Sequence, residues 1–105
     1  MTTASCAPLP PGNFPHVVGT LTINDRDTYC LHVGDVVQVA LRGSLTQRWA
    51  AVTATGSAVV GTQPIGVLMP RRDITLAFFR AAQKGSSQLE SKLGGQTWSA
   101  TIDVR

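Results

Sequence analysis

Few side chains in this sequence could perform catalysis. The only imidazoles are His16 and His32, and hydrolysis by a serine or cysteine nucleophile requires such a base, oriented by a third group. His32 alternates out of phase with the apolar residues Leu31 and Val33, so we expect it to face solvent. The glycine patterns of phosphate-binding loops and hydrolase elbows are missing from the sequence. We therefore predict a protein that is not an enzyme and that uses no cofactor.

The acidic residues offer one arrangement that could bind a metal. Asn24, Asp25 and Asp27 lie close together, and calcium takes six or more hard oxygen ligands. The same residues are typical of a turn, because Asn and Asp side chains hydrogen-bond to the nearby backbone. We favour a turn at Asn24-Asp25 and predict no metal site. The remaining acids are dispersed along the chain: Asp35, Asp73, Glu90 and Asp103.

The two cysteines, Cys6 and Cys30, suggest a covalent link. They are too far apart for a CxxC redox motif, and the histidines are too few to support a zinc site. We predict a Cys6–Cys30 disulfide that pins a proline-rich arm, residues 1–15, to a strand, with about 3 kcal/mol of stabilisation from loop closure. This predicts an extracellular or cell-surface protein whose export signal is not present in this chain. The alternative is two buried thiols in a cytosolic protein.

Charge and hydropathy exclude two classes of partner. The net charge of +3 comes from nine Lys and Arg residues that are scattered along the chain, with no aromatic residues interleaved among them. Binding to nucleic acid needs clustered cations that replace counterions along the phosphates, so we expect no nucleic-acid partner. No apolar run approaches the about 20 residues of a membrane span, so we expect no membrane insertion.

Period-two alternation predicts β-strands over most of residues 16–105. Val17 to Ile23, Tyr29 to Val33 and Val37 to Arg42 alternate, and Gly34-Asp35 predicts a hairpin between the second and third of these. Two short apolar pieces, Val59-Val60 and residues 64–69, contain or adjoin Gly and Pro and are typical of edge strands.

The C-terminal third shows the clearest alternation. Ile74, Leu76 and Phe78 share one strand face, as do Leu89, Ser91 and Leu93 after a turn that closes at Gly85. Trp98, Ala100, Ile102 and Val104 alternate in a last strand, which we expect to pair with residues 88–93 through Gly94-Gly95. The alternative is a helix over residues 76–84, ended by Gly85.

These elements predict a single all-β domain. Only 14% of the residues are charged, and Val, Thr, Ala, Gly and Ser dominate the composition. We expect an Ig-like antiparallel β-sandwich of about seven short strands over residues 16–105, after the arm of residues 1–15. Trp49 follows a polar connection and begins a further strand over residues 49–52. We predict that Trp49 fills the core between the sheets.

The strand pattern resembles known Ig-like domains. An apolar strand ending in Phe79-Arg80-Ala81, then Gly85 and Ser87-Gln88-Leu89, is similar to bacterial Ig-like domains. Val33-Gly34-Asp35 before an alternating strand, Trp49 after a loop and a strand at the carboxyl end resemble the chagasin-type inhibitors of cysteine proteases. That resemblance implies a protein that blocks a papain-like cleft with three loops at one end of the sandwich.

The loop motifs of that family are matched only in part. Its first loop carries Asn-Pro-Thr-Thr-Gly, whereas residues 43–47 here contain Thr46 but no Asn-Pro. Its second loop is glycine-rich, and Gly61-Thr62 is the counterpart in this chain. Its third loop carries Arg-Pro-Trp, whereas residues 92–98 contain Trp98 without Arg-Pro before it.

Two functions follow as hypotheses, both with a protein partner. The first is a non-enzymatic extracellular Ig-like binding or structural module of a bacterial secreted or surface protein, and the alternative is a chagasin-like inhibitor of papain-like cysteine proteases. Both would use the end loops, because rigid sandwiches display variable loops at their ends. A third hypothesis, carbohydrate binding, needs Trp98 or Tyr29 exposed as a stacking platform. The candidate contact residues are Ser44, Leu45, Thr46, Gln47, Gly61, Thr62, Leu93, Gly94, Gly95 and Gln96.

Overall fold

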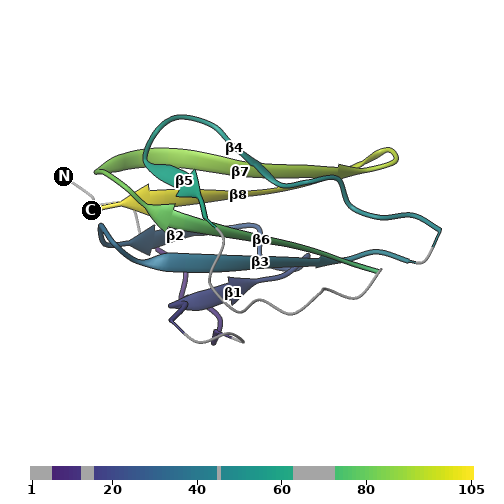
Figure 1. The fold of residues 1–105 in the computed structure, drawn as a ribbon, viewed down its shortest axis with the longest axis horizontal. Helices are drawn as coiled ribbons and strands as arrows, with labels where there is room; N and C mark the ends of the chain where they lie inside the picture. Colours follow the sequence, from purple (N-terminus) through teal and green to yellow (C-terminus); the bar gives the residue numbers. More distant parts are fainter. Residues whose placement is uncertain (1–5, 13–15, 45, 63–72) are drawn as a thin grey trace.

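The computed structural model of the protein describes residues 6–12, 16–44, 46–62 and 73–105. These residues form eight strands and no helix, in two four-stranded sheets that face each other (Figure 1). The predicted all-β sandwich is therefore confirmed, and the alternative helix over residues 76–84 is wrong. The strands are β1 (Gly19–Leu21), β2 (Thr28–Leu31), β3 (Val36–Arg42), β4 (Thr53–Ala54), β5 (Val59–Gly61), β6 (Ile74–Ala81), β7 (Gly85–Leu93) and β8 (Gln96–Val104).

The eight strands agree with the predicted number of about seven, but the sheets are mixed, so the predicted antiparallel pairing is wrong for two strand pairs. One sheet has the order β1-β3-β6-β5 and the other has the order β2-β8-β7-β4. The pairs β1–β3 and β2–β8 are parallel, and the other pairs are antiparallel. The first strand is shorter than the predicted run from Val17 to Ile23. β5 lies at a sheet edge as predicted, whereas the proposed edge strand at residues 64–69 lies outside the described residues.

The predicted hairpin through Gly34-Asp35 is wrong. A turn does form there, with Gly34 at φ +99° and the backbone N–H of Asp35 donating to the carbonyl of His32. However, β2 and β3 belong to different sheets, so this turn carries the chain across the sandwich instead of joining two paired strands. Local turn chemistry alone does not distinguish these two outcomes.

The core lies between the inner faces of the sheets. The predicted β7–β8 hairpin is confirmed, with Leu93 opposite Gln96 and Gly94 at φ +57° in the two-residue turn. Trp98, Ala100, Ile102 and Val104 all face the core, as the alternation predicted. Leu89 and Ser91 are also buried, and Leu93 packs against the core from the end of β7.

The face of β6 that lies in the core is set by its pairing with β3. Ile74, Leu76 and Phe78 share one face of β6, as predicted. In the pairing of β6 with β3, Phe79 and Ala77 lie opposite two core residues, Val37 and Val39 respectively. The inner face of β6 is therefore the one that carries Ala77 and Phe79. Both faces of β6 are apolar, so the alternation shows which residues share a face without showing which face is buried.

Trp49 is a core residue, as predicted, with only 3% of its surface exposed. The predicted strand over residues 49–52 is wrong, because the next strand, β4, begins at Thr53. In the stretch before β4, Trp49 and Ala50 are hydrogen-bonded to both sheets, as described below.

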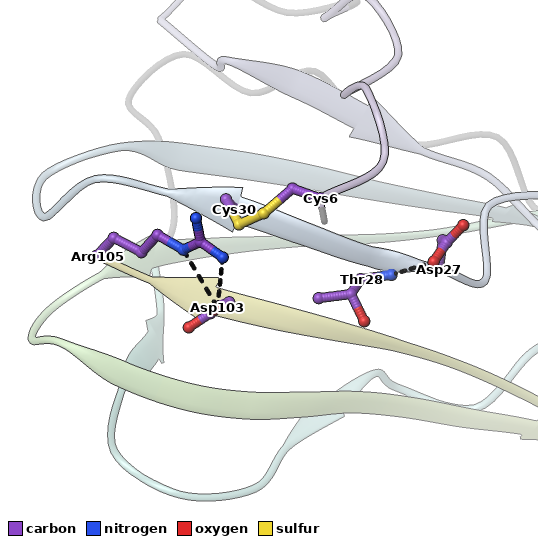
Figure 2. Close-up of a disulfide and its surroundings, with 6 residues drawn as sticks. All are labelled: Cys6, Asp27, Thr28, Cys30, Asp103 and Arg105. Atoms are coloured by element: carbon purple, nitrogen blue, oxygen red, sulfur yellow. Dashed lines mark hydrogen bonds and ion pairs between the residues drawn. A yellow bond between two sulfur atoms is a disulfide. The ribbon is translucent and has the colours of Figure 1, made fainter. Parts of the chain in front are cut away.

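The described part of the N-terminal arm, from Cys6 on, packs along one side of the sandwich. The predicted Cys6–Cys30 disulfide is present and joins the arm to β2, close to the ion pair of Asp103 and Arg105 (Figure 2). The backbone N–H of Ala7 donates to the carbonyl of Thr28 on β2, and the carbonyl of Pro10 accepts from Thr20 on β1, at 2.8 and 3.3 Å. We call residues 6–10 the strap, because they bridge the edge strands of both sheets, and Ala7 and Leu9 pack against the core.

Candidate functional site

Three connections of the described chain meet at one end of the sandwich, which we call the contact end. β1, β3 and β5 run toward this end and β6 starts there, as their pairing directions require. In the other sheet, the β7–β8 turn projects at the same end, away from the two chain termini (Figure 1). Among the described residues, the contact end therefore comprises residues 22–27, residues 43, 44 and 46–52, Asp73 before β6, and residues 93–96.

Most of the predicted contact residues that the structure describes occupy this end, with different degrees of exposure. Ser44, Thr46 and Gln47 are exposed, as are Gly94, Gly95 and Gln96. Gly61 and Thr62 do not lie at this end, because Gly61 is opposite Phe79 and the backbone N–H of Thr62 bonds to the carbonyl of Phe78, both toward the other end of β6. Leu93 packs against the core, so it does not form an exposed apolar tip. Leu45 lies outside the described residues.

Residues 43–48 form a compact tip. The backbone N–H of Ser44 donates to the carbonyl of Gln47 at 2.7 Å, and the N–H of Gln47 donates to Ser44 Oγ at 3.0 Å. Gly43 is needed at its position, because a Cβ atom there would collide with the carbonyl oxygen of Gln47. The tip is therefore held by its own hydrogen bonds before any partner arrives.

The base of this tip is clamped from both sheets. Thr75 Oγ1 on β6 donates to the carbonyl of Trp49 at 2.7 Å, and Ser91 Oγ on β7 donates to the carbonyl of Ala50 at 2.6 Å. The indole N–H of Trp49 donates to the carbonyl of Arg42, and the N–H of Ala50 donates to the carbonyl of Lys92. These bonds give the backbone carbonyls of Trp49 and Ala50 side-chain hydroxyl partners. They also hold residues 49–50 rigidly between the sheets.

Sequence reasoning missed Thr75 and Ser91. Ser91 lies between Leu89 and Leu93 at an inward-facing position of an alternating strand. A polar residue at such a position usually has a hydrogen-bond partner, and that signal could have identified it. Thr75 gave no comparable signal, because apolar residues lie on both faces of β6 and the sequence does not show which one is buried.

The β7–β8 turn presents almost bare backbone. No atom would lie within 4 Å of a Cβ added at Gly94 or Gly95, so the turn is open on its outer side. Trp98 lies below this turn and is fully buried, with its indole N–H donating to the carbonyl of Thr22 at 3.1 Å. Trp98 therefore belongs to the core, and it is not the counterpart of an exposed loop tryptophan.

The two aromatic rings that carbohydrate binding would need are buried and therefore inaccessible to a ligand. Trp98 has 0% of its surface exposed and Tyr29 has 3%, so neither can act as a stacking platform. The pKa of the Tyr29 hydroxyl is raised above its ordinary value of 10.0, chiefly because burial disfavours the charged phenolate. The third functional hypothesis is therefore wrong for these two residues.

Residues 22–27 form a rigid turn that belongs to the contact end. Asp25 Oδ2 accepts from both the backbone N–H and the hydroxyl of Thr22, at 2.8 and 2.9 Å. Arg26 donates to the carbonyls of Ile23 and Thr97, which ties this connection to the base of the β7–β8 hairpin. The predicted turn role of Asn24-Asp25 is confirmed. Among the described residues, no group of His, Cys, Asp or Glu side chains is arranged to hold a metal ion.

His32 is remote from the contact end. His32 is exposed in the turn between β2 and β3, with its Nδ1 3.8 Å from Asp35 Oδ2. This confirms that His32 faces solvent. Within the described parts of the chain, no helix is long and apolar enough to cross a membrane.

Comparison with known proteins finds similarity of fold. No family model matches the sequence, and no curated protein matches it. The cysteine protease inhibitor EhICP2 from Entamoeba histolytica has a similar crystal structure, with a TM-score of 0.65, 13% identity, and coverage of 82% of this chain and 93% of that one. The solution structure of Amebosin gives a TM-score of 0.55 at 14% identity, covering 88% and 100%. PbICP-C, solved in complex with falcipain-2, gives a TM-score of 0.45 at 14% identity, covering 90% and 95%.

Proposed function

We propose that this chain is an inhibitor of papain-like cysteine proteases that places its contact end in the active-site cleft of the enzyme. One observation carries the proposal: the chain shares its fold over most of its length with EhICP2, a cysteine protease inhibitor. The rigid tips at the contact end support it, because a tip that is ordered before binding loses little conformational entropy on association. On this proposal the chain is not an enzyme, and its partner is a protein.

Inhibition would be steric. A protease cleaves a peptide that lies extended in its cleft, whereas the β7–β8 turn reverses direction over Gly94 and Gly95. A two-residue turn cannot adopt the extended conformation without breaking the hairpin, so it would fill the cleft without being cleaved. The lack of side chains on these two glycines would allow the backbone to approach the cleft wall closely.

The tip at residues 43–48 would make the second contact. Its exposed side chains, Ser44, Thr46 and Gln47, offer hydroxyl and amide groups that can donate and accept hydrogen bonds. Its base at Trp49 and Ala50 is fixed by bonds from both sheets, so the distance between the two tips is set by the sandwich. We propose that the two tips enter the cleft together as a wedge.

A general Ig-like binding module is the second candidate. The same contact end could bind a different protein, but similarity to EhICP2 favours the inhibitor. We also propose an extracellular location, because the Cys6–Cys30 disulfide is typical of proteins from oxidising compartments. A bacterial source stays a prediction.

The test is the inhibition of papain by the purified chain. We expect nanomolar inhibition, and no inhibition at high micromolar concentration would overturn the proposal. Gly95→Glu adds a side chain at an open position without positive φ, so it should keep the fold and weaken inhibition. Val33→Glu is the matched control, because Val33 is 53% exposed in the turn at the opposite end and should have no effect.

A further inference from the structure

The end of the β7–β8 hairpin projects past the strands that flank it (Figure 1). β2 pairs with β8 only over residues 101–104, and β4 pairs with β7 only at Leu89 and Glu90. Within the described parts of the chain, no strand therefore lies beside the hairpin near its turn at Gly94 and Gly95. A two-stranded hairpin without neighbours is marginally stable in water, so the position of this turn depends on other contacts.

One of these contacts lies on the β7 side of the hairpin. The backbone N–H of Ala50 donates to the carbonyl of Lys92 at 2.9 Å, and the carbonyl of Ala50 accepts from Ser91 Oγ at 2.6 Å. Ala50 directly follows Trp49, the core residue at the base of the tip at residues 43–48. These bonds therefore link the hairpin to the base of that tip.

On the β8 side, the hairpin is held by the connection of residues 22–27. Three hydrogen bonds join this connection to β8: from the indole N–H of Trp98 to the carbonyl of Thr22, from the backbone N–H of Thr101 to the carbonyl of Asp27, and from Nη1 of Arg26 to the carbonyl of Thr97, at 3.1, 3.0 and 3.1 Å. The bond from Arg26 is nearest to the turn, because Thr97 directly follows Gln96, which pairs with Leu93. Arg26 therefore partners a backbone carbonyl of β8 in a stretch that β2 does not reach.

The side chain of Arg26 is fixed at two of its nitrogen atoms. Its Nε donates to the carbonyl of Ile23 at 3.0 Å, while its Nη1 donates to Thr97. The connection that carries Arg26 is itself held, because Asp25 Oδ2 accepts from both the backbone N–H and the hydroxyl of Thr22. The planar fork of a guanidinium can span two such carbonyls, whereas the ammonium group of lysine has no fixed fork.

We propose that Arg26 is a positioning residue for inhibition: it holds the turn at Gly94 and Gly95 in the direction in which the turn enters the protease cleft. This inference deepens the proposed function and rests on it. Ala50 fixes the hairpin to the tip on one side and Arg26 fixes it on the other, so together they set the angle between the two parts of the wedge. Without Arg26 the turn would become ordered only on binding, and the conformational entropy lost at that step would weaken inhibition.

Two substitutions separate the geometry of Arg26 from its charge. Arg26→Gln removes both the fork and the charge, whereas Arg26→Lys keeps the charge and removes the fork. We expect each to raise the inhibition constant for papain by about tenfold. Arg80→Gln is the matched control and should leave this constant unchanged, because Arg80 is an exposed residue of β6 that pairs with Val36, away from the contact end. An Arg26→Lys variant that inhibits as well as wild type would indicate a charge contact with the protease and would overturn the positioning role.

The Gly95→Glu variant provides a second test, because it impairs the turn directly. If Arg26 acts through the turn, Arg26→Gln should raise the inhibition constant of the Gly95→Glu variant by less than about twofold. A further loss of about tenfold in the double variant would mean that Arg26 acts independently of the turn, and the inference would be overturned.

Backbone order parameters from NMR relaxation, measured on the free protein, distinguish a failure of this inference from a failure of the proposed function. We expect the order parameters of Gly94 and Gly95 to fall in Arg26→Gln and to stay unchanged in Arg80→Gln. Unchanged values in Arg26→Gln would overturn the positioning role whether or not the chain inhibits a protease. If the values fall but the wild-type chain inhibits no papain-like protease, the positioning of the turn by Arg26 stands and the inhibitor proposal is overturned.

Discussion

The hydroxyl of Thr75 donates a hydrogen bond to the backbone carbonyl of Trp49, with 2.7 Å between the two oxygens. This bond joins β6 to the base of the tip at residues 43–48. Ser91 makes the corresponding bond to Ala50 from the other sheet. The tip therefore depends on both sheets for its position, and a defect in either sheet should be detectable in partner binding.

Thr75→Val should weaken inhibition while leaving the protein folded. Valine has nearly the same shape but cannot donate, so the carbonyl of Trp49 loses this partner. We expect a loss of about 1 kcal/mol in the free energy of unfolding and a higher inhibition constant. Thr101→Val is the matched control, because Thr101 is a half-buried threonine of β8, in the other sheet from Thr75. Equal inhibition constants for Thr75→Val and wild type would show that the clamp does not position the tip.

Ser87 and Ser91 provide a comparison on one face of β7. Ser87 is buried, and its Oγ has no hydrogen-bond partner among the described residues, whereas Ser91 Oγ donates to the carbonyl of Ala50 at 2.6 Å. Ser87→Ala should be neutral or stabilise the fold by up to about 1 kcal/mol, because it removes an unpaired polar group from the core. Ser91→Ala should destabilise it by about 1–2 kcal/mol. Urea unfolding of both variants measures the difference, and the opposite order would contradict the assigned bonding.

Breaking the disulfide should release the strap without abolishing inhibition. Cys6 and Cys30 are 24 residues apart in the sequence, and opening a loop of that size costs about 3 kcal/mol in the chain-entropy model. We expect the Cys6→Ser, Cys30→Ser double variant to lose this amount of stability and to be cleaved faster in the strap by an added protease. Its inhibition constant should not change under conditions where it is folded. Two alkylatable thiols in the native, oxidised wild type would contradict the disulfide itself.

Tyr29 should make the fold sensitive to alkaline pH. Its pKa is raised in the folded protein above 10.0, chiefly by burial, so the unfolded chain loses this proton first as the pH rises. The stabilising contribution is complete below pH 10.0 and is lost as the pH rises through the folded pKa. Tyr29→Phe has no titrating group and should lose less thermal stability than wild type between neutral pH and pH above 10.0. Parallel loss of melting temperature in both proteins would contradict this role.

The parts of the fold that sequence predicted best are those with local pairing. The β7–β8 hairpin follows from alternation on both sides of Gly94-Gly95, and the burial of Trp49 and Trp98 follows from their size. The parallel pairings of β1 and β2 were missed because each joins residues that are distant in the chain. Local turn signals such as Gly34-Asp35 do not report which sheet receives the next strand.

Part of the contact end was predicted from the sequence, but the hydrogen bonds that hold it in place were not. Two of its connections were identified as loops of one end, Gly61 and Thr62 were assigned to that end wrongly, and Asn24-Asp25 were interpreted only as a turn. The part of residues 22–27 in the contact end became evident through Arg26, which bonds to the carbonyl of Thr97, 71 residues away in the sequence. The hydrogen bond from Thr75 to Trp49 could not be predicted either. It requires Thr75 to face the core, and both faces of β6 are apolar enough to do so.

The most direct test of the proposed wedge is whether it competes with a ligand that fills the protease cleft. Binding of the chain to free papain is measured by titration calorimetry and compared with binding to papain whose active-site cysteine carries a bulky covalent peptidyl inhibitor. We predict nanomolar binding to the free enzyme and a loss of at least about a hundredfold in affinity when the cleft is filled. Equal affinity for the free and the blocked enzyme would contradict a contact end that occupies the cleft.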